Sequence, residues 1–394
     1  MKYLMPVKPY NPMWKCPLSL ILLFVFSYLR TEAQTRDGLE TELVRLGMEN
    51  VFVLDTDTIC TLVFENNVNR LKDFGTQTII RQLPFQGKPV CIILLENNVP
   101  VLQLFSATGS NSPDEWTASY NIDTDWKNIH CAGKSNTSLF KFDLVIYPEL
   151  NFRNIKLEKM YDWMVNISPA IEFSAWKGMR FTGQVIFPLV NQYGEQYKQI
   201  RPGIIAVSQQ VRFPYRWFAK ATIGTFTRDR WGADLKIFRP FRNERFAFRA
   251  QAGLTGTSSW WNWRWYYSLP KRLTWSVGGQ YYNPRYQVQT MLRVSRYLAG
   301  DYGVRADMMR HFRYTTIGFY GLKTNKSRWN GGFYFTVALP PYKQKRNKFL
   351  VTTSDYFNME YNAGADLYYG QSYKTSPGEN FSEENFNPFF ILNN

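Results

Sequence analysis

The chain has 394 residues, of which 17% are aromatic and 20% charged, and its mean hydropathy of −0.35 excludes a helical membrane protein. Its formal net charge of +16 suits nucleic acid, an anionic membrane surface or an acidic polymer as partner. The length allows two domains. Because the sequence holds no C-x-x-C pair and no Cys/His cluster, we expect no metal site and no cofactor.

The N-terminus has the pattern of a secretory signal. Three lysines precede a short apolar run at 17–28, and Ala33 supplies a small residue beside a cleavage site. An uncleaved anchor is the alternative, although the run is shorter than the roughly 20 apolar residues that a membrane span needs. We therefore expect residues 1–34 to be a signal peptide. Secretion makes nucleic acid the weakest of the three partners, so we expect none.

Residues 35–105 have the pattern of a small α+β domain, which we expect in the periplasm. Apolar spacing predicts the order α-β-β-α-β-β, with helices at 35–48 and 67–83 and strands at 50–54, 59–64, 90–95 and 99–105. An echo indicates a duplication, since Glu65-Asn66-Asn67-Val68 follows Cys60 at the same distance as Glu96-Asn97-Asn98-Val99 follows Cys91.

Cys60 and Cys91 both fall on predicted strands of this domain. A disulfide between them is one interpretation in an oxidising compartment. Two buried thiols are the other, because unpaired cysteines are common in cores.

Residues 106–138 are rich in Ser, Thr, Asn, Asp and Gly without an apolar period, which predicts a linker. From 139 to 340 one alternating segment follows another, each near ten residues, a length that suits a tilted crossing of a bilayer. Thirteen candidate strands begin near Phe142, Trp163, Met179, Gly203, Arg216, Trp231, Arg245, Trp260, Lys271, Gln287, Tyr302, Thr315 and Trp329. Residues 341–394 form a C-terminal segment that can complete a barrel.

Each of these segments has one apolar and one polar side. Phe246, Phe248 and Leu254 alternate with Arg245 and Arg249, for example, and residues two apart share a face of a strand. A soluble sandwich or propeller also alternates. Long aromatic-capped apolar sides and fully charged polar sides favour a transmembrane barrel. We therefore predict a mainly β protein, an antiparallel outer-membrane β-barrel of about 12–14 strands after a small α+β periplasmic domain.

The polar sides are expected to face the lumen and to make it net positive. The lumen-facing candidates are Arg180, Arg212, Arg216, Lys220, Arg245, Arg249, Arg264, Arg272, Arg293, Arg305 and Asp307. Guanidinium groups pair with carboxylates and phosphates, and rings of such charge give pores a preference for anions. The alternative is a barrel that its own salt bridges close.

No catalytic arrangement stands out, so we do not expect an enzyme. The only histidines, His130 and His311, have no serine or cysteine partner by spacing. Asp301 and Asp307 offer the two carboxylates of a glycosidase, with Arg305 between them. A charge pair that holds the wall in register is the better interpretation of these residues.

One run resembles a known family. Residues Arg296, Tyr297, Leu298, Ala299, Gly300, Asp301, Tyr302 and Gly303 read RYLAGDYG. Together with shorter patterns over roughly residues 40–370, this run is similar to the YjbH-like exopolysaccharide and capsule biosynthesis family of outer-membrane proteins. The resemblance implies a role in export or assembly of an extracellular polysaccharide, with outer-membrane lipid, polysaccharide and other envelope export proteins as partners. A non-conducting outer-membrane anchor or docking protein is the alternative.

Overall fold

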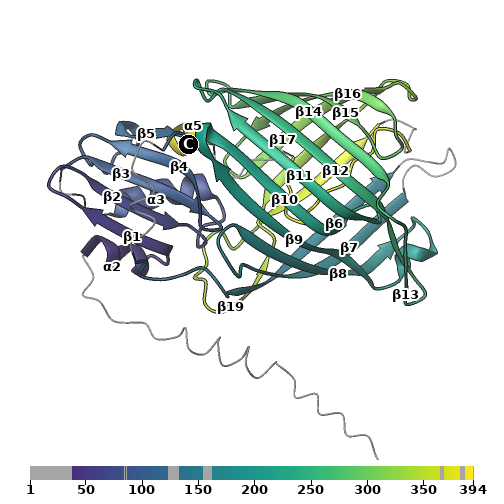
Figure 1. The fold of residues 1–394 in the computed structure, drawn as a ribbon, viewed down its shortest axis with the longest axis horizontal. Coiled ribbons are helices and arrows are strands. Elements are labelled where there is room, and N and C mark those ends of the chain that lie inside the picture. The colour runs from purple at the N-terminus through teal and green to yellow at the C-terminus, as the bar shows by residue number, and fades with distance from the viewer. Residues whose placement is uncertain are drawn as a thin grey trace, which may run out of the picture. The chain divides into compact units, whose positions relative to one another are not determined.

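The computed structural model describes residues 38–394 apart from 84, 86, 123–132, 154–161, 364–367, 382–386 and 394. The predicted signal peptide and His130 lie outside the described residues. The remainder forms one compact unit that begins at Gly38. Figure 1 shows that this unit contains a small sheet and a large one.

The small sheet has five strands in the order β1-β2-β3-β4-β5. Its strands are β1 (Glu49–Asp55), β2 (Cys60–Glu65), β3 (Val90–Glu96), β4 (Val99–Ser106) and β5 (Thr117–Ser119), with helices α2 (Gly38–Arg45), α3 (Lys72–Gln82) and η1 (Pro113–Glu115) between or before them. The β2 and β3 strands run parallel, and the other pairs are antiparallel. The predicted order of elements up to β4 is thus observed, and the expected linker adds β5 to the sheet edge.

The small sheet is apolar on both sides, which explains why β2 and β3 are continuous apolar runs rather than alternating ones. Leu62, Phe64 and Ile92 face a core that includes Leu43 of α2 and Ile79 of α3. On the other side lies a second cluster of Val63, Cys91, Ile93 and Leu95. No helix among the described residues is long and apolar enough to cross a membrane.

Cys60 and Cys91 lie on these neighbouring parallel strands but do not form a disulfide with each other. Cys60 is opposite Val90, while Cys91 is opposite Thr61, so the register offsets the two by one residue. Successive side chains of a strand point to opposite sides. Cys60 therefore packs in the core that holds Phe64, and Cys91 packs in the cluster of Val63. Disulfide pairing was the wrong interpretation.

The large sheet contains fifteen strands, and its neighbours are antiparallel except at β19. The strands are β6 (Phe142–Arg153), β7 (Asp162–Phe173), β8 (Met179–Asn191), β9 (Arg201–Phe213), β10 (Trp217–Phe226), β11 (Arg230–Pro240), β12 (Phe246–Trp261), β13 (Arg264–Tyr267), β14 (Arg272–Asn283), β15 (Val288–Arg296), β16 (Tyr302–His311), β17 (Thr315–Thr324), β18 (Asn330–Ala338), β19 (Phe349–Thr353) and β20 (Tyr356–Asn362). Short helices are η2 (Glu195–Lys198), η3 (Pro214–Arg216) and α5 (Pro388–Asn393). The prediction of a mainly β protein with a large antiparallel sheet is confirmed.

The strand predicted near Trp260 is not a separate crossing. The β12 strand continues to Trp261, and β13 folds back on it through the two-residue turn Asn262–Trp263, both with positive φ. Such a turn matches the right-handed twist of a hairpin. Alternation continues through both arms, which is why the sequence pattern resembles one more crossing.

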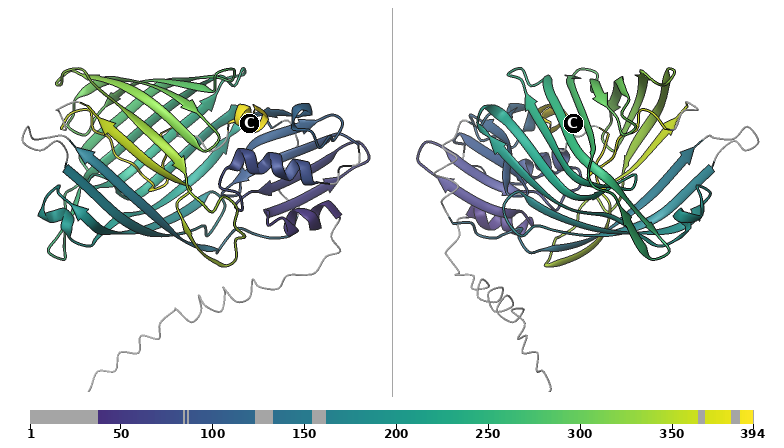
Figure 2. Two further views of the ribbon diagram at one scale, coloured as in Figure 1. Left: turned by 180° about the vertical axis from the view of Figure 1, so that it is seen from behind. Right: turned by 45° about the vertical axis from the view of Figure 1, so that its right-hand side comes forward.

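The large sheet curls, as the two views of Figure 2 show, without closing into a hydrogen-bonded barrel. Its strand order begins with β19 and ends with β20, which only Ser354 and Asp355 separate. The β19 strand pairs in parallel with β6, and β20 pairs with β18. One segment of chain therefore touches both edges of the sheet, although β20 lies beside β6 without a strand pairing among the described residues.

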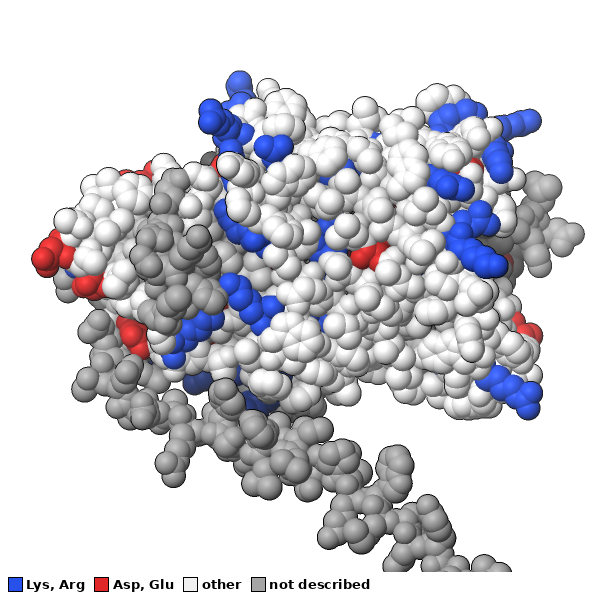
Figure 3. Space-filling model, viewed as in Figure 1, with Lys and Arg blue, Asp and Glu red and all other residues white. Residues whose placement is uncertain are grey.

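In the large sheet, apolar side chains are exposed on one side and polar side chains are buried on the other, which is the reverse of the usual arrangement in a water-soluble protein. We call inner face the side that the described parts of the C-terminal segment, 368–381 and 387–393, contact, and outer face the other. Outer-face side chains are apolar and exposed, such as Val277, Val294 and Val304, which are register neighbours on three strands and are 44%, 45% and 45% exposed. In Figure 3 one face of the large sheet is mostly white, with blue side chains mainly toward its margins.

Candidate functional site

The inner face of the large sheet gathers buried polar side chains. They alternate with the exposed apolar positions of the same strands, so Thr274 and Gln280 of β14 are buried while Val277 is exposed. Asp234 of β11 and Gln289 of β15 are buried in the same way. The period of two in the sequence thus produces a polar interior.

Asp307 on β16 is the centre of a charge network on this face. Its carboxylate is 3.2 Å from the guanidinium of Arg293 and 2.9 Å from that of Arg305. Arg305 also pairs with Glu360 of β20 at 3.3 Å, and its guanidinium lies 4.0 Å from the centre of the Tyr320 ring. These contacts join four strands. Asp307 is thus engaged by two guanidinium groups, whereas Asp301 accepts the backbone amide of Gly370.

A second charge network lies between β6, β7 and β8. Arg180 pairs with Glu172, and the Tyr147 hydroxyl donates to the same carboxylate at 2.7 Å. Glu172 is buried, and an unpaired buried carboxylate would be costly. Arginine here neutralises the wall and is not an open anion site.

The C-terminal segment lies against the inner face. The Tyr373 hydroxyl donates to Asp234 at 2.7 Å, Glu379 pairs with Lys236, and the rings of Phe381 and Tyr334 stack at 4.3 Å. Further along, Phe390 of α5 packs edge-on against Tyr282 with ring centres 5.1 Å apart. Contacts therefore follow this segment over much of the inner face.

The α5 helix at the end of this segment reaches the small sheet. The Gln77 side chain of α3 donates to the carbonyl of Ile391 at 2.5 Å, and Ile391 belongs to the core of the small sheet. Phe218 of β10 joins the same core. The small sheet, the C-terminal helix and one end of the large sheet thus share a core.

Several predicted lumen residues bind protein atoms on or near the inner face. Arg212 donates to the carbonyls of Val101 at 3.1 Å and Tyr120, so it attaches the small sheet. Arg249 donates to Gln280 at 2.8 Å and lies over the ring of Phe238. Lys220 lies on β10 beside the inward Thr222. These side chains hold the interior together.

Four of the predicted lumen residues lie away from the inner face or at its margin. Arg216 belongs to η3 and donates to the carbonyl of Phe241, which places it at a turn. Arg245 precedes β12 and is exposed, and Arg272 is exposed at the start of β14. Arg264 lies on β13, whose four residues are all exposed. The period-two pattern was extended past the strand at Arg216 and Arg245, whereas Arg264 lies on the exposed hairpin arm and Arg272 on the first residue of its strand.

The RYLAGDYG run forms the turn between β15 and β16. Gly300 has a φ of 81°, and the amide of Tyr297 donates to the carbonyl of Asp301 at 2.8 Å. The Asp301 carboxylate accepts the amide of Gly370 at 2.8 Å, and the amide of Leu298 donates to the carbonyl of Gln371 at 3.0 Å. The motif therefore fixes the start of the C-terminal segment.

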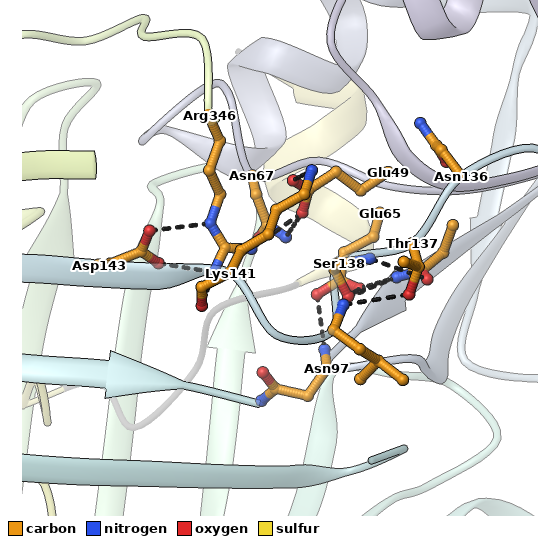
Figure 4. Close-up of polar contacts among 12 residues, drawn as sticks. Glu49, Glu65, Asn67, Asn97, Asn136, Thr137, Ser138, Lys141, Asp143 and Arg346 are labelled. Carbon is orange, nitrogen blue, oxygen red and sulfur yellow. Dashed lines mark hydrogen bonds and ion pairs between the residues drawn. The ribbon is translucent and has the colours of Figure 1, made fainter. Parts of the chain in front are cut away.

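A buried polar cluster, which sequence analysis missed, joins the small sheet to the large one (Figure 4). Arg346 lies 2.9 Å from Glu49 of β1 and 2.7 Å from Asp143 of β6. Lys141 also pairs with Glu49, at 2.6 Å. The two carboxylates raise the pKa of Arg346 against the effect of its burial, which lowers it. No local sequence pattern predicts contacts between residues so far apart in the chain.

The same cluster contains the echoed motif of the small domain. The Glu65 carboxylate accepts the amides of Asn97 at 2.8 Å and Asn98 at 3.2 Å, and the Asn50 side chain at 2.5 Å. Asn97 and Asn98 both have positive φ, as a two-residue hairpin turn requires. In the first copy of the motif, Glu65 therefore accepts the hydrogen bonds that hold the turn at Asn97 and Asn98 in the second copy.

Arg70 is another long-range contact that sequence analysis missed. Its buried guanidinium donates to the carbonyls of Leu339 at 3.1 Å and Ser354 at 2.7 Å, and to the Thr353 hydroxyl at 3.0 Å. Thr353 and Ser354 lie where β19 ends and β20 follows, and Leu339 directly follows β18. Arg70 therefore ties the small domain to the segment that touches both edges of the large sheet.

A cavity of about 590 Å³ opens on the inner face, between the sheet and the C-terminal segment. Its wall includes strand ends and turns far from the small sheet, among them η2 and the β10–β11 turn. Aromatic rings, cations and carboxylates all contribute to the lining. Cavities of this size hold small-molecule ligands, which occupy roughly 300–1,000 Å³.

Metal-ligand clusters are not found among the described residues. His311 is buried, with its ring nitrogens 3.0 Å from the Thr316 hydroxyl and 2.8 Å from the Gln289 amide oxygen. It is a buried histidine with a partner for each ring nitrogen. Comparison of the chain with protein-family models, curated proteins and solved structures finds no match.

Proposed function

We propose that this chain is an outer-membrane β-barrel protein that takes part in export or assembly of an extracellular, anionic polysaccharide. One observation supports the location in a membrane: the outer face of the large sheet is apolar and exposed, while its inner face holds buried polar side chains. Soluble proteins rarely expose large contiguous apolar patches. Hydrocarbon solvates such a face, while the interior of a barrel accommodates polar groups.

The exposed apolar surface is continuous across neighbouring strands. Besides the row of Val277, Val294 and Val304, a second row joins Met308, Phe319 and Phe333 on β16, β17 and β18. Large exposed aromatics lie near both ends of the strands, such as Trp329 before β18 and Tyr286 before β15. Aromatic side chains at both interfaces are typical of membrane barrels.

Strand length and closure also support the proposal. The β6–β12 and β14–β18 strands have between 9 and 16 residues, enough for a tilted crossing, which takes about 9–11. A barrel further requires β20 to pair with β6, next to which it lies. Unpaired edge groups cannot remain in hydrocarbon, so we expect this seam to close in a membrane.

The connections suggest an orientation. Short turns such as 174–178, 241–245 and 312–314 lie beside the small sheet, as shown by the bond from Gly178 to Asn97. The opposite end carries the longer connections 192–200 and 262–271. Outer-membrane barrels have short periplasmic turns and longer extracellular loops, so the small domain belongs in the periplasm.

The polysaccharide part rests on the resemblance of the RYLAGDYG run to the YjbH-like family. Its test is a strain that lacks the gene, assayed for surface and secreted polysaccharide with and without the wild-type chain. We expect the polymer to fall in the deletion strain and to return on complementation. Unchanged polymer in the deletion strain would remove this part of the proposal.

A non-conducting anchor or docking protein is the second candidate, and a specific observation favours it. Two stretches of the C-terminal segment, 370–381 and 387–391, contact the inner face, and ion pairs such as Lys236–Glu379 and Arg293–Asp307 also lie there. Conductance in planar bilayers separates the two candidates. A conduit gives steady channels with the intact chain, whereas an anchor gives none and still copurifies with envelope proteins.

A further inference from the structure

The cavity at the end away from the small sheet differs from the rest of the inner face in its chemistry. Elsewhere on this face, Arg293 and Arg305 pair with carboxylates, Arg212 donates to backbone carbonyls and Arg249 donates to the Gln280 side chain. Here Arg228 and Lys374 both line the cavity, and neither side chain makes a hydrogen bond or ion pair with the residues that the structure describes. Lys374 instead lies over the ring of Phe381, at 4.9 Å.

Arg228 is presented to the cavity by an unusual turn. It connects β10 and β11, and both Arg228 and Asp229 adopt left-handed backbone conformations, with φ of 60° and 52°. Arg228 lines the cavity, and its side chain is exposed and not buried among other side chains. Left-handed arginine is strained, and such strain is often found at binding sites.

Aromatic rings form another part of the same wall. Trp260 and Trp265 come from the two arms of the β12–β13 hairpin and meet edge-on with ring centres 5.6 Å apart. The Trp265 indole donates to the Ser258 hydroxyl at 2.7 Å, which fixes its plane. Tyr197 of η2 lines the cavity close to Arg201, whose guanidinium lies 5.1 Å from the ring centre.

The carboxylates of the wall are already engaged. Glu360 pairs with Arg305 at 3.3 Å, and Glu149 accepts the side-chain amides of Asn166 at 3.2 Å and Gln184 at 3.1 Å. Asp229 interacts with Tyr197 and Arg201. The available charge is therefore positive, at Arg228 and Lys374.

We propose that this cavity binds a short acidic oligosaccharide, with Arg228 and Lys374 on its carboxylates and the tryptophan pair against the apolar face of a sugar ring. Guanidinium groups pair with carboxylates through two parallel hydrogen bonds. Aromatic rings offer the flat apolar surface that the C–H groups of a pyranose need. The inference deepens the proposed function, on which it rests, because it names the substrate class that the inner face contacts.

The test is calorimetric titration of the full chain, purified in detergent, with a tetramer of α-1,4-linked galacturonic acid. Maltotetraose, with the same linkage and no carboxylate, and inorganic phosphate serve as comparison probes. We expect the acidic tetramer to bind and to weaken as salt rises, with maltotetraose and phosphate each at least about tenfold weaker. No binding of the tetramer, or equal binding of either comparison probe, overturns the proposal.

Variants locate the site. Arg228→Gln is expected to weaken tetramer binding about tenfold or more, because a charged hydrogen bond is lost. Arg285→Gln is the matched control, since Arg285 is exposed on the β14–β15 turn and lies outside the cavity lining. Trp265→Leu keeps an apolar side chain and should weaken both sugars alike. Equal affinity of Arg228→Gln and wild type overturns the assignment.

The two proposals fail separately. If deletion of the gene abolishes polymer but the purified chain binds no acidic tetramer, the role in polysaccharide export stands and the cavity site is wrong. If the tetramer binds in the cavity but deletion leaves polymer unchanged, the binding site stands and the export role is wrong.

Discussion

The small and large sheets use similar residues in opposite arrangements. In the small sheet, Phe64 and Leu62 are buried between strands and helices, as in any water-soluble domain. In the large sheet, Val294 and Phe319 are exposed and Asp307 is buried. Burial of apolar surface stabilises a fold in water, and both sheets bury some, since Met291, Met309 and Tyr334 form a cluster inside the large sheet, but only the large sheet also exposes one continuous apolar face. This difference in exposure is the observation on which the proposal of a membrane environment for the large sheet rests.

The strongest test of this contrast compares two phenylalanines. Phe64→Ala should cost about 3–5 kcal/mol, because it leaves a cavity in the small-domain core. Phe319→Ala, at a position 60% exposed, should cost under about 1 kcal/mol in detergent. Denaturant unfolding of the purified variants, followed by circular dichroism, measures both. Similar losses of unfolding free energy at the two positions would contradict the proposed difference between the two sheets.

Interleaved substitutions on β12 probe the two faces of the large sheet directly. Replacing Phe246 and Phe248 with Asp should block membrane assembly, since a charge on the lipid face near the midplane costs roughly 2–4 kcal/mol for basic residues and somewhat less for acidic ones. Replacing Arg245 and Arg249 with Gln should leave a folded chain. Outer-membrane yield of each variant is the readout. Assembly of the Asp pair together with failure of the Gln pair would mean that the faces are assigned in reverse.

Disrupting the Arg346 cluster, which joins the small sheet to the large one, is expected to lower the free energy of unfolding by a smaller amount. Arg346→Ala leaves Glu49 and Asp143 with fewer partners and should cost about 1.5–3 kcal/mol. Lys345→Ala, at the exposed neighbour, is the control and should cost little. Scanning calorimetry should show the melting of the small domain separating from that of the sheet only in the Arg346 variant. A single unchanged transition there would show that the cluster does not couple them.

The smallest effect is expected at Glu244, which connects the large sheet to Ser119 and Tyr120 of the small domain. Its ionisation should make the stability of this contact depend on pH. Burial raises the pKa of Glu244 above 4.5, although hydrogen bonds from Ser119 and Tyr120 oppose the rise. Because the folded pKa is the higher one, this contribution to stability is full below about pH 4.5 and is lost as pH rises through the folded value. Glu244→Gln should flatten the profile of melting temperature against pH in that window. Parallel profiles for variant and wild type would refute it.

Regular features of the fold could be predicted from the sequence. Strand starts at Phe142, Met179, Tyr302 and Thr315 agree with the structure because alternation and turn residues are local signals. The pattern failed at Arg264, where alternation continues through the Asn262–Trp263 turn into a hairpin arm. Local periodicity therefore identifies strands better than it identifies where a strand turns back.

Contacts between distant residues could not be predicted. Arg70 and Arg346 reach partners more than 200 residues away, and no period relates them. The C-terminal segment lacks alternation between apolar and polar residues, so the sequence pattern did not predict its contacts with Asp234 and Asp301. Of the arginines that line the cavity, Arg305 was predicted from strand periodicity, whereas Arg201 at a strand start and Arg228 on a turn were missed.

The central claim is that the large sheet is embedded in an outer membrane. Fractionation of cells that produce the chain, followed by gel electrophoresis in dodecyl sulfate with and without boiling, tests it most directly. We expect the chain in the outer-membrane fraction, with a mobility that changes on boiling because a closed barrel stays folded in the detergent. A chain in the soluble fraction with one mobility under both conditions would contradict the account.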